Sequence, residues 1–221
     1  AICDGYIINT CTVTAVSDKK SRNAIRRVRK LNPNAVVGVC GCYAQSSPDE
    51  IRKLDVDVLI GTDGREAFVR HMIDAAQTRQ KWDCVDDAGG PRAFEILPAG
   101  GLAARTRALL KVEDGCNNFC TYCVVPYVRG RERSRRPEDI VAEARELVES
   151  CCKDITLLGQ NVNSYGKDLG LGVDFADLIR MINDIPGEFL IRFMTSHPKD
   201  ATEELFKTMA ECEKCAHQLH L

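Results

Sequence analysis

Short apolar runs alternate along the chain with longer stretches in which apolar residues recur at helical spacing. Residues 6–9, 36–40 and 56–60 are apolar runs of strand length, and they predict strands buried on both faces. The stretch after the first run predicts an amphipathic helix with Ser17-Asp18 as its cap. Strands and helices in alternation predict an α/β fold with a doubly wound parallel sheet. The apolar face of that first helix is formed by Ala24, Ile25, Val28 and Leu31.

The same alternation restarts in the second half of the chain. Three strand-helix pairs in succession are typical of the opening part of a β/α barrel, whose functional side chains lie at the carboxyl ends of the strands. A closed barrel needs more strands than these, so we expect only its first part. The predicted strands cover residues 108–112, 155–158 and 189–194, and the predicted helices begin at Pro137 or cover residues 175–185 and 201–210.

These patterns divide the chain into three segments. Residues 1–78 are expected to form the sheet domain, residues 79–105 a linker, and residues 106–221 the barrel-like domain. The linker contains the breakers Gly89-Gly90-Pro91 and Pro98-Ala99-Gly100-Gly101. The chain lacks an initial Met and enters a strand almost at once, so we expect a piece of a longer protein, with the first domain truncated at its start and the second at its end.

Composition narrows the class of protein. The sequence contains no run of eighteen apolar residues that would predict a transmembrane helix and no basic leader that would predict secretion. We therefore expect a cytoplasmic protein without a membrane partner. Twelve cysteines are many for such a chain. In a reducing compartment they favour thiolates held for a metal centre over disulfides.

The strongest chemical motif is Cys116-x-x-x-Cys120-x-x-Cys123, which directly follows a predicted strand. Thiolates hold iron–sulfur clusters, and three ligands on a four-iron cluster leave one iron open. S-adenosylmethionine could chelate that iron and, after one-electron reduction, release a 5′-deoxyadenosyl radical. The alternative is a structural zinc knuckle, which usually needs a fourth Cys or His nearby, whereas the next cysteine is Cys151.

Several motifs in order identify a family resemblance. Residues Gly115–Tyr127, followed by Arg129-Gly130 and Ser134-Arg135, resemble the radical S-adenosylmethionine methylthiotransferases. Residues Leu157–Tyr165 and Arg192–Pro198 resemble the MiaB-type branch of that family specifically. The resemblance covers nearly the whole chain. It implies a 4Fe–4S cluster on Cys116, Cys120 and Cys123, with S-adenosylmethionine bound beside it.

The resemblance also implies a second 4Fe–4S cluster in the first domain. Asn9-Thr10-Cys11 and Gly41–Gln45, which contains Cys42, match two of its ligand motifs. Both cysteines follow predicted parallel strands, at the edge where doubly wound sheets bind ligands. The usual third ligand lies upstream of the segment present here, and Cys3 does not match its motif. Without the resemblance, buried packing would explain Cys11 and Cys42 equally well.

Polar residues at the ends of the barrel strands are candidates for contacts with S-adenosylmethionine. The resemblance places Gln160, Asn161, Ser196 and His197 there. Arg129 and Arg135 are candidates for meeting a carboxylate or phosphate. The competing interpretations are a solvated surface turn for the two arginines and an ordinary strand-end hydrogen bond for His197.

The family resemblance implies transfer of a methylthio group to C2 of isopentenyladenosine next to the tRNA anticodon, with an electron donor and a sulfur donor as further partners. The segments Thr10–Thr14 and Ser17–Arg22 instead look like the branch that acts on threonylcarbamoyladenosine. The branch that modifies a ribosomal protein fits less well, and a non-catalytic zinc-bearing RNA-binding module is the alternative from another class. The basic stretch Lys19–Lys30 is a candidate phosphate-contacting face, although an ordinary solvated helix explains it too.

Overall fold

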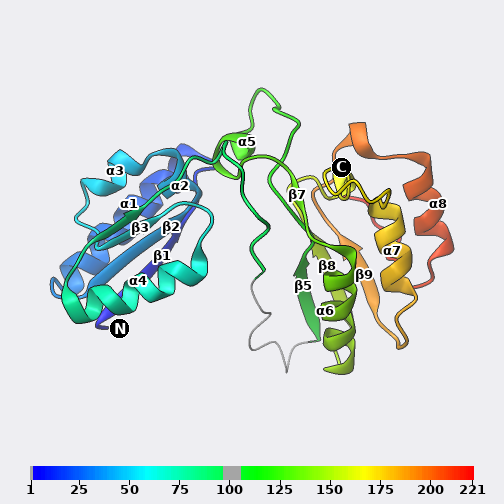
Figure 1. The fold of residues 1–221 in the computed structure, drawn as a ribbon, viewed down its shortest axis with the longest axis horizontal. Coiled ribbons are helices and arrows are strands. Elements are labelled where there is room, and N and C mark those ends of the chain that lie inside the picture. The colour runs from blue at the N-terminus through cyan, green and yellow to red at the C-terminus, as the bar shows by residue number, and fades with distance from the viewer. Residues whose placement is uncertain (1, 97–105) are drawn as a thin grey trace. The chain divides into compact units, whose positions relative to one another are not determined.

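The computed structural model describes residues 2–96 and 106–221. The chain forms two compact units, each with its own sheet (Figure 1). The first comprises the described residues of Ala1–Glu95 together with Asn118–Gly130, and the second those of Ile96–Asn117 and Arg131–Leu221. No helix in the described ranges is both long and apolar enough to cross a membrane.

The first unit is built on a four-stranded parallel sheet whose strands follow one another in chain order. Its strands are β1 (Gly5–Thr10), β2 (Val36–Gly41), β3 (Val58–Ile60) and β4 (Trp82–Cys84). Its helices are α1 (Ala15–Leu31), α2 (Cys42–Ser46), α3 (Pro48–Arg52), α4 (Arg65–Thr78) and α5 (Val125–Val128). The first three strands and the amphipathic α1 agree with the elements that hydrophobic periodicity predicts.

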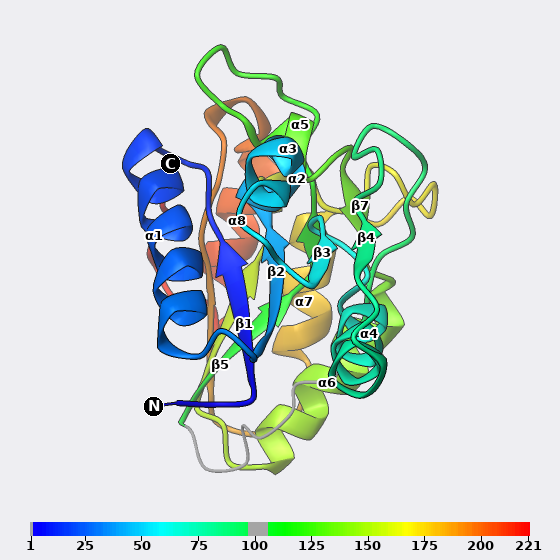
Figure 2. The ribbon, with the colours of Figure 1, turned by 90° about the vertical axis from the view of Figure 1, so that its left-hand side faces the viewer.

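Alternate side chains of the sheet feed two separate apolar clusters. Val37 and Val39 of β2 pack with Ile25 of α1 on one face. Val36 and its neighbours on the other face pack with Phe68 of α4. Figure 2 shows α1 and α4 on opposite sides of this sheet. Helices on both faces confirm the predicted layered parallel sheet, and the fully buried pattern of β2 explains why its sequence shows no polar alternation.

Two local features differ from the sequence-based expectation. α1 begins at Ala15 and not after Ser17, because the Thr14 hydroxyl accepts the Ser17 amide and caps the helix one turn earlier. β4 lies inside the segment predicted as a linker, where it pairs with β3 from Val58–Trp82 to Ile60–Cys84. The sequence of β4 is three residues long and shows no apolar alternation, so it does not predict a strand. The strand forms because it pairs with β3, which is distant in sequence. The breakers at residues 98–101 lie outside the described residues.

The second unit opens with a three-stranded parallel sheet in the order β5-β8-β9. Its strands are β5 (Arg107–Lys111), β8 (Asp154–Leu158) and β9 (Leu190–Phe193), and a two-stranded antiparallel ribbon is formed by β6 (Glu113–Asp114) and β7 (Arg133–Ser134). Its helices are α6 (Pro137–Glu149), α7 (Phe175–Asn183) and α8 (Glu203–Glu211), with 3₁₀ turns η1 (Val162–Ser164) and η2 (Pro198–Asp200).

One apolar core joins the three helices of the second unit to its sheet. Leu110, Leu157 and Phe193 lie in the same cluster as Ile140 of α6 and Ile179 of α7. Figure 1 shows α6 and α7 alongside β5, β8 and β9. Parallel strands in chain order, each followed by a helix on the same face, are the arrangement expected for the first part of a β/α barrel.

Candidate functional site

The carboxyl edge of the second unit's sheet gathers residues that are far apart in sequence. Leu157 of β8 pairs with Leu110 of β5 and with Phe193 of β9. The segments that carry Cys116, Gln160 and Ser196 therefore all leave the sheet at the same edge. This is the edge at which β/α barrels place their functional side chains.

The beginning of the cysteine loop is fastened by several hydrogen bonds. Gln160 Oε1 accepts the Gly115 amide at 2.6 Å, and Asp114 Oδ1 accepts the same amide at 3.0 Å. Asp114 is buried, and Oδ2 of its carboxylate pairs with Lys111 at 2.5 Å and with Arg133 at 3.3 Å. These contacts hold the residue before Cys116 in place without using any thiol.

Glu113 is a fully buried acid two residues after β5. Its Oε2 accepts the Gln160 amide at 2.7 Å and the Asn161 amide at 3.2 Å, which ties β6 to the turn after β8. Burial, together with the nearby Glu132 and Asp114 carboxylates, raises the pKa of Glu113 to about 8 despite these two amide donors. Glu113 is therefore mostly protonated at neutral pH.

The loop itself presents its thiols on a tight turn. The Cys123 amide donates to the Cys120 carbonyl at 2.9 Å, and Phe119 before them takes a positive φ of 47°. Cys116 is buried, while Cys120 and Cys123 are half-buried. None of the twelve cysteines is in a disulfide. Three thiols within eight consecutive residues are the donor set that a 4Fe–4S cluster takes, so these residues fit the group.

The described residues show no preassembled metal centre. Within residues 2–96 and 106–221, no three Cys, His, Asp or Glu side chains lie close enough to bind one ion.

Asn161 and Asp200 bridge the segments after β8 and β9. Asn161 is buried, and its amide nitrogen donates to Asp200 Oδ2 at 2.7 Å. Lys167 pairs with Asp200 Oδ1 at 2.5 Å. Burial alone would raise the pKa of Asp200, but the hydrogen bonds from Lys167 and Asn161 outweigh burial and hold the pKa below its ordinary value. These contacts fix the orientation of the Asn161 side chain.

Ser196 and His197 lie on the segment that leaves β9. The Ser196 hydroxyl oxygen is buried and has no hydrogen-bond partner among residues 2–96 and 106–221, and the Ser196 amide donates to the His220 carbonyl at 3.1 Å. His197 Nδ1 accepts the Lys199 amide at 3.2 Å and caps η2. An unpartnered buried hydroxyl at this edge is a group that a polar ligand could satisfy.

The two candidate arginines occupy different surroundings. Arg135 is buried, its guanidinium pairs with Glu143, and Nη2 donates to the Asp139 carbonyl at 3.1 Å. Its donors therefore stabilise the start of α6 within the second unit. Arg129 belongs to the first unit, where it is half-buried and follows α5.

Cys11 and Cys42 begin the segments that leave two paired strands at the carboxyl edge of the first unit's sheet. Each directly follows one member of the register pair Thr10–Gly41 of β1 and β2. Thr10 Oγ1 donates to the Cys40 carbonyl at 2.6 Å and accepts the Ala44 amide at 3.1 Å. A Cβ on Gly41 would meet the Thr10 carbonyl oxygen at 2.4 Å, so the close approach of the two strand ends requires glycine. The structure thus brings these two cysteine-bearing segments together.

The remaining cysteines divide into core and surface residues. Cys40 packs in the core of the first unit, and burial raises the pKa of its thiol. Of the adjacent Cys151 and Cys152, Cys152 is buried, whereas Cys151 is exposed at a positive φ of 68° just after α6. Four further thiols lie outside the candidate sites: Cys212 and Cys215, buried in the core of the second unit, Cys84, exposed at the end of β4, and Cys3, exposed before β1.

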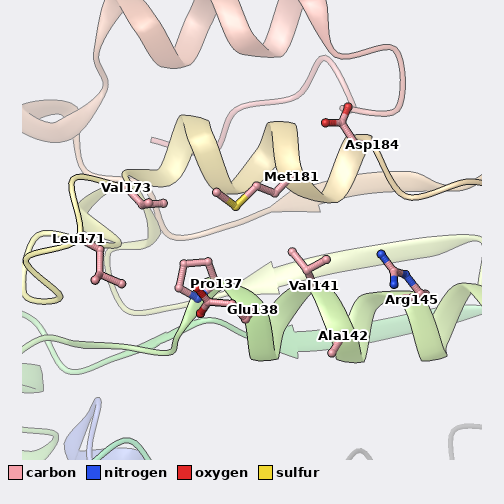
Figure 3. Close-up of a pocket in the computed structure, with 9 residues that line it drawn as sticks. All are labelled: Pro137, Glu138, Val141, Ala142, Arg145, Leu171, Val173, Met181 and Asp184. Carbon is pink, nitrogen blue, oxygen red and sulfur yellow. The ribbon is translucent and has the colours of Figure 1, made fainter.

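An apolar groove lies between α6 and α7 in the second unit. Figure 3 shows Val141 and Met181 directed into it from the two helices, with Arg145 and Asp184 at its polar end. Its volume is about 710 Å³. None of its nine lining residues is a candidate site residue.

Sequence reasoning missed three residues that organise these sites: Glu113, Asp200 and Thr10. An acid between a strand and a Gly-Cys pair was the available signal for Glu113. Asp200 and Thr10 carry no such signal, because their partners are 39 and 34 positions away.

Comparisons with known proteins agree with the motifs. Residues 1–61 match the uncharacterized protein family UPF0004, and residues 110–221 match the radical SAM superfamily. A tRNA-2-methylthio-N(6)-dimethylallyladenosine synthase of Clostridium tetani is 43% identical over 99% of this chain and 49% of its own length. The threonylcarbamoyladenosine tRNA methylthiotransferase MtaB of Bacillus subtilis is 39% identical over 99% of this chain and 49% of its own length. The chain thus spans about half the length of these curated relatives.

A solved structure has a similar fold. The radical S-adenosylmethionine methyltransferase TsrM of Kitasatospora setae matches with a TM-score of 0.59 and 18% identity, over 96% of this chain and 46% of that one. At this identity the likeness concerns the fold alone. The predicted resemblance to methylthiotransferases is confirmed by the sequence identities above. Because the superfamily match at residues 110–221 covers about half of the chain and includes the three-cysteine loop, this chain belongs to the radical SAM superfamily.

Proposed function

We propose that this chain is the part of a tRNA methylthiotransferase that binds a 4Fe–4S cluster and S-adenosylmethionine. The intact enzyme would add a methylthio group to C2 of isopentenyladenosine next to the anticodon. The observation that carries the proposal is the loop with Cys116, Cys120 and Cys123, which begins at the carboxyl edge of a parallel sheet. The 43% identity to the Clostridium tetani synthase supports this choice of reaction.

The residues at the sheet edge divide into cluster ligands, loop supports and a cofactor contact. When bound, the cluster would supply the electron that cleaves the sulfonium of S-adenosylmethionine. The radical released by this cleavage would abstract hydrogen from an unactivated carbon. The three thiolates hold the cluster, and Glu113 with Gln160 fixes the start of their loop. The Ser196 hydroxyl, which has no partner among the residues that the structure describes, would make a polar contact to the bound cofactor.

The other candidate cofactor contacts are two residues at the strand ends and two arginines. Asn161 and His197 lie beside Gln160 and Ser196 at the same strand ends, which supports a role for their polar atoms in binding S-adenosylmethionine. Arg129 is proposed to meet a carboxylate or phosphate. Arg135, already paired with Glu143, is better suited to positioning the chain that leaves β7.

A second 4Fe–4S cluster is proposed at Cys11 and Cys42. Their place after the paired Thr10 and Gly41 supports a shared site, with a third ligand that the family resemblance places upstream. A separate electron donor and a sulfur donor are proposed as further partners of the enzyme. We propose that the enzyme works on tRNA in the cytoplasm.

Threonylcarbamoyladenosine is a second candidate substrate. The Thr10–Thr14 segment resembles enzymes that act on threonylcarbamoyladenosine, and the Bacillus subtilis relative with that name is 39% identical. The reaction at C2 and the cofactors would be unchanged, and only the group on N6 of the adenine would differ.

The experiment is anaerobic reconstitution with iron and sulfide, followed by reduction with dithionite in the presence of S-adenosylmethionine. We expect release of 5′-deoxyadenosine that disappears in Cys120→Ala. Addition of tRNA carrying either N6-modified adenosine then identifies the substrate by the methylthio group gained. A zinc-loaded protein that never cleaves S-adenosylmethionine would refute the proposal and favour the non-catalytic module.

A further inference from the structure

We propose that the outward face of α1 is a contact surface for the phosphate backbone of the RNA substrate. This inference rests on the proposed function, which supplies RNA as the substrate class. The helix carries seven cations between Lys19 and Lys30, and the structure separates them into two groups with different roles.

Two of the seven cations are engaged within the first unit. Arg29 pairs with Asp57 at 2.8 Å and donates to the Ala35 carbonyl at 2.8 Å. Arg22 donates to the Tyr43 hydroxyl at 2.6 Å. Both side chains are half-buried, so they fasten α1 to the unit and are not available to a partner.

The other five cations are exposed, and in the described part of the chain none of them makes an ion pair or hydrogen bond. At about 100° per helical residue they fall within an arc of about 120°, on the side opposite the buried Ser21 and Ile25. They extend over about 16 Å of the helix axis, at about 1.5 Å per residue. The five are Lys19, Lys20, Arg26, Arg27 and Lys30.

The surface is shaped as well as charged. Asn23, Arg26, Arg27, Lys30 and Leu31 line a groove of about 400 Å³ on α1. Guanidinium groups and an amide around one hollow provide several donors to phosphate oxygens. Such donors contact the backbone and carry no direct information about base sequence.

The charge distribution favours a nucleic acid over a protein partner. The chain as a whole has a net charge of −2, so five unpaired cations on one helix face are a local concentration and not a general property. Protein interfaces usually have an apolar core. Here the exposed apolar side chains Val16 and Leu31 lie at the two ends of the helix, and polar residues occupy the middle.

The test uses the full chain and a fluorescently labelled anticodon stem-loop RNA. Binding is measured by anisotropy across about 50–200 mM salt, the range in which phosphate contacts dominate the affinity. The test variant is the triple substitution Arg26→Gln, Arg27→Gln and Lys30→Gln. The matched control removes three exposed cations elsewhere, with Lys53→Gln, Arg70→Gln and Lys207→Gln.

We expect the test variant to weaken RNA binding at least about tenfold and to reduce the salt slope by about 2 to 3, since each lost phosphate contact removes about 0.7 to 0.9 from it. The control should stay within about twofold of the wild type. The substitutions should weaken binding to a stem-loop of scrambled sequence by the same factor as binding to the native stem-loop. An unchanged slope in the test variant, as a protein-binding face would give, or a loss confined to one RNA sequence would overturn the proposal.

Failure of this surface is distinguishable from failure of the proposed function. Release of 5′-deoxyadenosine without RNA should be equal in the wild type and the test variant. Loss of RNA binding in a chain that never cleaves S-adenosylmethionine would support the surface and refute the enzyme. If the triple variant unfolds, Arg27→Gln alone should reduce the salt slope by about 1.

Discussion

Oε2 of Glu113 lies 2.7 Å from the backbone nitrogen of Gln160, so a buried acid joins the strand before the cysteine loop to the turn after β8. Gln160 in turn accepts the Gly115 amide beside Cys116. The two contacts form a closed connection between two strand ends of the second unit. The ionisation of Glu113 therefore affects the place where the first cysteine is held.

The pH dependence of stability should report on Glu113. Its folded pKa of about 8 lies above its ordinary value of 4.5, so its stabilising contribution is complete below about 4.5 and is lost as the pH rises toward 8. Glu113→Gln keeps an oxygen acceptor and cannot ionise. We expect this variant to gain stability over the wild type by up to about 1.4 kcal/mol per pH unit in that window.

Urea unfolding between pH 5 and 9 measures this difference. Glu149→Gln, which removes an exposed acid at the end of α6, is the control and should follow the wild type. Parallel curves for the wild type and Glu113→Gln would contradict the assignment of the pH dependence to this residue.

Gly159→Ala should disturb the same connection by steric means. A Cβ at this position would lie 2.1 Å from Glu113 Oε2, far inside contact distance. We expect a loss of about 1–3 kcal/mol in the free energy of unfolding, typical of overpacking. Gly5→Ala is the control, since its nearest neighbour would be an ordinary 3.6 Å away.

A double-mutant cycle identifies the origin of that loss. If the clash with the carboxylate causes it, Gly159→Ala should be less damaging in a Glu113→Ala background than in the wild type. Additive losses in the double variant would place the damage elsewhere in the turn.

Much of this organisation can be predicted from periodicity, and what cannot is long-range. Apolar spacing locates β2, β8 and α6 because their own side chains contact the core. The placement of Gln160 and Ser196 at one edge of the sheet can be predicted from the parallel connectivity of the strands alone. Arg135 was expected to meet a ligand, but its partner Glu143 on α6 is determined only by how that helix packs. β4 escaped detection for the same reason, because β3 supplies its hydrogen bonds.

Thr10 should be required for the sheet edge that presents Cys11 and Cys42. Thr10→Val removes a buried hydroxyl that donates to the Cys40 carbonyl and accepts the Ala44 amide, so both groups lose this partner. We expect a loss of about 1–3 kcal/mol. Hydrogen exchange at the Ala44 amide should accelerate with it. Thr10→Ser keeps the hydroxyl and should restore the slow exchange; fast exchange in Thr10→Ser would show that packing of the methyl group matters more.

Iron content should separate the motif cysteines from the other thiols. After anaerobic reconstitution, Cys120→Ser and Cys123→Ser should each bind about four fewer iron atoms per chain than the wild type, because a 4Fe–4S cluster with two thiolates is poorly held. Cys84→Ser and Cys151→Ser remove exposed thiols outside the motif and should bind as much iron as the wild type. Any iron that survives in Cys120→Ser should be lost when Cys11→Ser and Cys42→Ser are added, because those two thiols are the proposed ligands of the second cluster. Equal iron loss in the Cys84 and Cys151 controls would mean that the thiols bind iron without regard to position, and the assignment of the loop would fail.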